Sequence, residues 1–270
     1  MGAAWQKCAR WWSYRRQRLG QAAPDLVGAL RDVIGVYSAH PSGPLSLHAR
    51  VPCLTAGAFR RLDVERLALR LPAMRRSIYM LPRQSAHLAF RATALPHAAH
   101  DEMVRRHGFG EARYRELRGA ILSAAQEPRT ARQLRADVGS ADRSLLPVLR
   151  ALTYEGLLLR VGAASLRSNQ VAYVATETWL GELLPQAAAA GALTWLAGEY
   201  LRAFGPARPV DFKWWAGVTM DRARAALAAV DCVEVGGGYL LPYSDSNAFE
   251  VARAPGRDTL DLLPKWDSYT

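Results

Sequence analysis

Residues 130–176, TARQLRADVGSADRSLLPVLRALTYEGLLLRVGAASLRSNQVAYVAT, predict two helices followed by a pair of strands. Thr130 and Gln133 have the spacing of a capping box, in which the Thr hydroxyl accepts a backbone N–H and the Gln side chain reaches back. Leu134 and Val138 fall on one face of the helix that this box opens. Gly139 is placed to end that helix, since glycine readily adopts the backbone conformation of a helix C-terminus.

The second helix of this stretch carries leucines at helical spacing and contains Pro147. Proline is tolerated in the first turn of a helix, where the N–H groups have no helical partner, so we expect the helix to begin near Ser144. Gly156 ends it. Residues 157–161 and 170–174 then read as two strands of a hairpin joined by a polar loop.

A further helix precedes this stretch, over residues 114–126, with apolar side chains at helical spacing. Three helices followed by a hairpin form the winged-helix pattern, in which the third helix enters a DNA groove and the hairpin loop is the wing. We therefore predict one winged-helix unit over residues 106–185. Arg143 and Arg150, on or beside its third helix, and Arg167, near the wing tip, are candidate DNA-binding residues.

The same order recurs over residues 193–243, where a glycine triplet at 236–238 supplies the hairpin turn, and predicts a unit over 186–250. Trp214 and Trp215 are adjacent in its second helix. Because neighbours in a helix cannot share one face, we expect one of them to pack inward and the other to face the neighbouring unit.

Residues 1–105 are less regular, and we interpret them as an embellished first unit. Residues 25–35 and 63–71 look helical, residues 37–44 form a polar loop, and residues 76–81 read as a strand closed by Pro82. The predicted fold is therefore mainly α with small β-hairpin wings, in three tandem winged-helix (helix-turn-helix) units.

Composition supports a polyanionic partner. The chain has 35 Lys and Arg residues against 24 Asp and Glu residues, a net charge of +11, and arginine suits phosphate geometrically. We expect double-stranded DNA as the partner and a monomer as the oligomeric state.

The sequence contains no apolar run long enough to span a membrane and no signal peptide, so we expect no membrane contact and a cytoplasmic, nucleoid-associated location. The three cysteines are widely spaced and form no CxxC pair, so we expect neither a disulfide framework nor a zinc site. We expect no other metal and no cofactor.

Four stretches resemble the AlkZ-like DNA glycosylase family, also known as the HTH_42 winged-helix family. They are residues 35–51, the signature loop, and residues 74–82, 149–157 and 200–217. The resemblance implies tandem winged helices that bind damaged duplex DNA, and in active members excise bulky alkylated purines and unhook interstrand crosslinks.

The resemblance also points to a catalytic motif, Gln-Φ-Gln with Φ apolar, whose two amides can hold a water against the sugar carbon. Alignment on Gly35 places Ser38 and His40 at these positions, with Ala39 between them, and a gap near Gly43 leaves Tyr37 as the alternative to Ser38. His40 could orient or deprotonate water near neutral pH. Ser38 and His40 are therefore the candidate catalytic residues, and loss of catalysis is the alternative.

Three further DNA-binding candidates lie in the resembling stretches. Arg50 belongs to the signature loop, Arg75 matches a family arginine, and Ser77 stands where the family often has Thr. A salt bridge at a strand end is the alternative role for Arg75.

Residues 262–270 are similar to the entrance of the family's C-terminal β-rich domain. We therefore expect residues 251–270 to begin such a domain in a truncated chain or fragment. A genuinely shortened member of the family is the alternative.

Three hypotheses for function follow. The first is a winged-helix DNA-binding protein with a lapsed Ser-Ala-His loop, the second is an active DNA glycosylase using Ser38 and His40, and the third is a protein-interaction scaffold. Salt-dependent DNA binding separates the first two from the third, and base release separates the second from the first.

Overall fold

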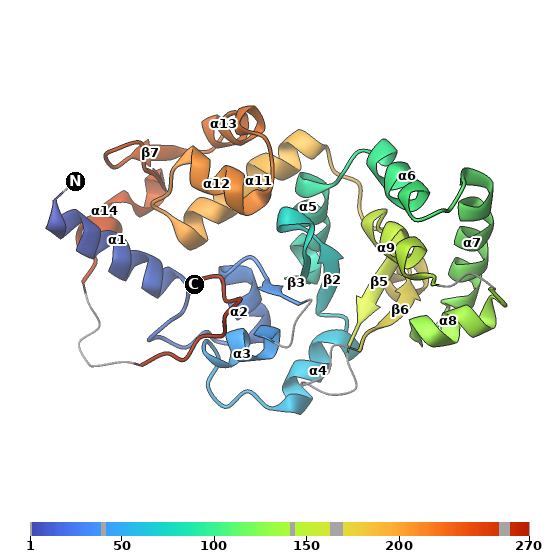
Figure 1. The fold of residues 1–270 in the computed structure, drawn as a ribbon. Coiled ribbons are helices and arrows are strands. Elements are labelled where there is room, and N and C mark those ends of the chain that lie inside the picture. Colours follow the sequence, from blue (N-terminus) through green and yellow to red (C-terminus); the bar gives the residue numbers. More distant parts are fainter. Residues whose placement is uncertain (1, 39–41, 141–143, 163–169, 254–259, 270) are drawn as a thin grey trace.

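The computed structural model describes residues 2–38, 42–140, 144–162, 170–253 and 260–269. The fold is mainly helical, with an antiparallel sheet in the order β1-β3-β2-β5-β6-β4 and a separate two-stranded sheet β7-β8 (Figure 1). The predicted fold class is confirmed in this coarser form. No described helix is long and apolar enough to cross a membrane.

The first third of the chain combines helices with the central strands. Its elements are α1 (Ala3–Arg16), α2 (Leu26–Asp32), β1 (Val36–Tyr37), α3 (Ser42–His48), α4 (Ala56–Val64), β2 (Ala68–Pro72), η1 (Met74–Arg76), β3 (Ile78–Pro82) and α5 (Arg83–Thr93).

The predicted strand over 76–81 and the helix after Asp25 are confirmed, but the predicted helix over 63–71 is wrong. That stretch contains the end of α4 and the strand β2, which is buried along its whole length. A short apolar run buried on both faces has no period that separates strand from helix.

The middle third follows the predicted order of helices and hairpin. Its elements are α6 (His97–Arg106), α7 (Glu111–Ala124), β4 (Arg129–Thr130), α8 (Ala131–Asp137), α9 (Leu146–Tyr154), β5 (Leu158–Val161), β6 (Ala172–Ala175) and α10 (Thr176–Leu180). The capping box of Thr130 and Gln133 is present, and Pro147 lies in the first turn of α9, both as predicted.

The last third repeats this order with a shorter hairpin. Its elements are α11 (Ala189–Phe204), α12 (Pro209–Ala216), α13 (Met220–Ala228), β7 (Cys232–Glu234), β8 (Leu240–Pro242), η2 (Tyr243–Asp245) and α14 (Ser246–Glu250). The described residues after α14 contain no strand, where we had expected the beginning of a β-rich domain; they run back along the first third of the chain (Figure 1).

The first two predicted units share one sheet, because β2 pairs with β5 at Arg70 and Arg160. One core cluster extends from this sheet through α5 to α11, α12 and α13. These contacts fix the helices of the last third against the β2–β3 hairpin. Residues of η1 and α12 line a cleft between the two parts.

Candidate functional site

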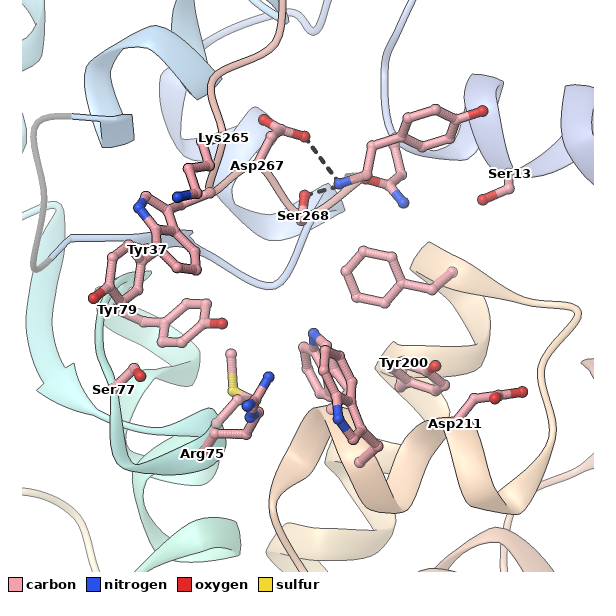
Figure 2. A pocket seen from close by; sticks show the side chains of 17 residues that line it. Ser13, Tyr37, Arg75, Ser77, Tyr79, Tyr200, Asp211, Lys265, Asp267 and Ser268 are labelled. Atoms are coloured by element: carbon pink, nitrogen blue, oxygen red, sulfur yellow. Dashed lines mark hydrogen bonds between the residues drawn. The ribbon is translucent and has the colours of Figure 1, made fainter.

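A cleft of about 810 Å³ lies between the β2–β3 hairpin, helices α11 and α12, helix α1 and the C-terminal residues 265–269. Figure 2 shows Tyr37, Tyr79, Ser77 and Arg75 along one side and Tyr200 and Asp211 across from them. Its lining is rich in aromatic side chains, so the cleft offers flat apolar surfaces bordered by charged groups.

The wall formed by β1 and β3 presents two tyrosines. Tyr37 and Tyr79 are paired across the strands, and their ring centroids are 6.2 Å apart in an edge contact. Burial raises the pKa of Tyr79 to about 12, although the charge of Arg75 opposes the shift. Tyr79 is therefore protonated at neutral pH, and its hydroxyl can act as a hydrogen-bond donor.

The opposite wall is an aromatic cluster on α11 and α12. The ring of Trp215 lies 4.9 Å from Tyr200 and 5.4 Å from Phe204, centroid to centroid. Trp214, the next residue back, is 65% exposed and lines the cleft. The prediction that one tryptophan packs inward and the other faces the neighbouring unit is confirmed, because Arg75 of η1 lies over the Trp214 ring.

The C-terminal residues close the third side of the cleft. The ring of Trp266 lies 5.8 Å from that of Tyr37, with the ammonium of Lys265 5.2 Å from its centroid. Asp267 holds this segment in place through Arg50: two guanidinium nitrogens of Arg50 donate to the carboxylate at 2.7 and 2.8 Å.

The prediction that Arg50 contacts DNA is wrong for this structure. Its side chain is fully buried and also donates to the backbone carbonyls of Gln17 and Ser46. Burial opposes ionisation of Asp267, but the hydrogen bonds and charge of Arg50 outweigh it and lower the pKa of Asp267. Arg50 therefore has a structural role, since no phosphate can reach a guanidinium enclosed in this way.

Ser38 follows β1 and is half-buried. Its N–H donates to the carbonyl of Ile78 at 2.8 Å, which continues the β1–β3 pairing. Its Oγ accepts a hydrogen bond from Nε of Arg70 at 2.9 Å, and Arg70 also forms an ion pair with Asp63. Tyr37 lines the cleft whereas Ser38 does not, as expected for successive residues of a strand.

The other predicted site residues fall into three groups. Arg75 and Ser77 line the cleft, so the structure brings them together with Tyr37. Arg150 is exposed on α9, with its guanidinium 5.4 Å from the Tyr154 ring, away from the cleft lining. The predicted residues outside the described part of the chain are His40, Arg143 and Arg167.

Sequence reasoning missed Tyr79, Trp266 and Asp267 as parts of the site. Tyr79 follows Ser77 by two residues of extended backbone, so both side chains lie on the same face, and this spacing could have pointed to Tyr79. Nothing in the sequence around Trp266 and Asp267 points to partners near the other end of the chain.

Chemically, the cleft can accept a planar aromatic group between aromatic walls and a phosphate near its cations. Arg75 and Lys265 lie at its edge, and Asp211 is paired with Arg208 at 3.2 Å. Among the described residues, no three His, Cys, Asp or Glu side chains are grouped so that they could hold a metal ion.

Both the sequence and the fold are similar to those of known proteins. A family model described as DNA glycosylase AlkZ-like matches residues 34–270. Among solved structures, the chain is similar to Streptomyces sahachiroi DNA glycosylase AlkZ, with a TM-score of 0.75 and 17% identity over 100% of this chain and 77% of that one. No curated protein matches.

Proposed function

Because this chain belongs to the AlkZ-like DNA glycosylase family, we propose that it binds modified double-stranded DNA and hydrolyses the bond between a modified base and its sugar. The observation that carries the proposal is the position of the signature loop. Within this stretch, Tyr37 at the end of β1 lines the aromatic cleft, and the next residue, Ser38, is held by Arg70.

The proposed interface uses the repeated order of three helices and a hairpin. We take α7, α8 and α9 with β5 and β6, and α11, α12 and α13 with β7 and β8, as winged helices, and the first third of the chain as a third such unit. Arg150, exposed on α9, is then placed to reach a groove or phosphate, and Arg143 and Arg167, which lie outside the described residues, stay predicted contacts. The net charge of +11 favours such a contact.

The proposed chemistry needs little acid catalysis when the base is alkylated at N7 of a purine. Such a base already carries positive charge and leaves as a neutral molecule, so the protein has mainly to place a water against the sugar carbon. Ser38 accepts from Arg70, which leaves its own O–H free to donate to a water, and His40 supplies the group that can accept the water's proton. Bulky adducts and interstrand crosslinks are the proposed lesions.

Salt dependence of DNA binding tests the DNA-binding half of the proposal. We expect the affinity for a short duplex to fall steeply between about 50 and 200 mM salt, since each phosphate contact releases counterions. Arg150→Gln should reduce the slope of log affinity against log salt by about one. Affinity that is weak and insensitive to salt would favour a protein-interaction scaffold instead, the second candidate for a basic chain of repeated units.

A further inference from the structure

Trp214 is an exposed aromatic side chain on the outer face of helix α12. It is 65% exposed, whereas Phe212 and Ala216 on the same helix are buried. Its neighbour Trp215 supplies the aromatic contact with the core through Tyr200. The exposed indole therefore adds little to the packing of α12 and is available to a partner.

A cation is held against this indole. The guanidinium of Arg75 lies 4.2 Å from the centroid of the Trp214 ring. Among the cation–ring pairs in the described residues it is the closest, and it joins an element of the first third of the chain to one of the last third.

The backbone that carries Arg75 is fixed in an uncommon conformation. Arg75 and Arg76 have φ angles of 53° and 59°, in the left-handed region that costs free energy for residues other than glycine. The turn is closed by Ala73 N–H to the carbonyl of Ser77 and by Arg76 N–H to the carbonyl of Ala73, both at 2.9 Å. Strained backbone of this kind is characteristic of positions where a side chain must be presented to a ligand.

The end of helix α12 packs closely against this turn. A Cβ added at Gly217, which ends α12, would lie 3.0 Å from Cα of Arg75. Because glycine at a φ of 75° lets α12 lie this close to the turn, the indole and the guanidinium are positioned before any partner binds.

We propose that Trp214 and Arg75 form a stacking site for an unpaired nucleobase of bound DNA, at the rim of the aromatic cleft. The indole offers its free surface to the base, and the exposed guanidiniums of Arg75 and Arg76 neutralise the flanking phosphate. A nucleotide suits this pair better than a protein side chain does, because it combines a flat ring with an adjacent anion. The inference rests on the proposed function, since it requires DNA on this face.

Binding to two labelled duplexes tests the site: one fully paired, and one with a single unpaired purine. The wild-type protein should prefer the unpaired purine. Trp214→Ala should weaken binding of that duplex by about 5- to 150-fold, which corresponds to about 1–3 kcal/mol for a single stacked base, and leave the slope of log affinity against log salt unchanged. Trp214→Phe should restore most of the loss, and unchanged thermal unfolding of both variants confirms that they fold.

Lys213, exposed on the same helix, provides the matched control. Lys213→Ala should weaken both duplexes equally and reduce the salt slope, because it removes charge without removing a ring. A Trp214→Ala variant that keeps the wild-type preference for the unpaired purine would overturn the stacking site while leaving the proposed function intact. Absence of salt-dependent binding to either duplex by the wild-type protein would overturn both.

Discussion

Arg50 and Asp267, 217 residues apart in the sequence, form an ion pair whose two side chains are completely buried. The pair ties the C-terminal residues to α3 and to the end of α1, and so fixes the wall of the cleft that carries Trp266. Its role is structural, and it makes the shape of the cleft depend on both ends of the chain.

Removing one partner of this ion pair should lower the free energy of unfolding. Arg50→Met is expected to lower the free energy of unfolding by about 3–5 kcal/mol, because it leaves the Asp267 carboxylate buried without its cation. Chemical denaturation checks this value. The double variant Arg50→Met, Asp267→Leu should recover much of the loss, since no isolated charge remains. If Arg50→Met were fully stable but lost affinity for DNA, the structural role would be refuted.

The same pair predicts a pH dependence of stability. The pKa of Asp267 is lowered in the folded protein, so its contribution is present above the ordinary aspartate pKa of about 3.9 and is lost as the pH falls through the lowered value. Unfolding measured from pH 6 to pH 2.5 should show the advantage of wild type over Asp267→Asn shrinking below about pH 4. An advantage that grows on acidification would contradict this assignment.

Ser38 should contribute to stability as well as to any chemistry. Ser38→Ala removes the acceptor of the Arg70 Nε–H and is expected to cost about 1–3 kcal/mol, because a partly buried donor is left unsatisfied. Ser38→Thr keeps the hydroxyl and should retain the stability. Equal melting temperatures for wild type and Ser38→Ala would show that the contact contributes nothing.

Replacing Gly217 by a larger residue is expected to destabilise the folded protein. Gly217→Ala would place a Cβ 3.0 Å from the backbone of Arg75 at a φ of 75°, so we predict a loss of about 1–3 kcal/mol in unfolding free energy. Gly119→Ala in α7, where an added Cβ meets nothing within 4 Å, should instead be neutral or stabilising. Similar behaviour of the two variants would show that α12 and η1 are not in close contact in solution.

Local signals predicted the helices and hairpins of residues 114–176 and 193–243 well, because capping residues, prolines and apolar spacing act within one element. The capping box at Thr130 and the start of α9 illustrate this. Strand β2 was not predicted because a strand buried on both faces shows no alternation of apolar and polar residues. Its burial depends on β3 and β5, which arrive from other parts of the chain.

The site was harder to predict because its parts meet only in the folded chain. Arg50 was predicted to contact phosphate because it lies in the stretch that resembles the family's signature loop, and the sequence shows no acidic partner for it. Its partner Asp267 is near the opposite end. Helix geometry predicted that one of Trp214 and Trp215 packs inward and the other outward. Which ring is which, and the contact of the outward ring with Arg75, required the structure.

Base release from a duplex carrying an N7-alkylated purine, measured as strand scission after alkaline treatment with Ser38→Ala and His40→Ala in parallel, tests the proposed glycosylase activity most directly. We predict scission above spontaneous depurination for the wild-type protein and its loss in His40→Ala at unchanged stability. No scission by a wild-type protein that binds the duplex in a salt-dependent manner would contradict the hydrolytic activity and leave a DNA-binding protein with a lapsed loop.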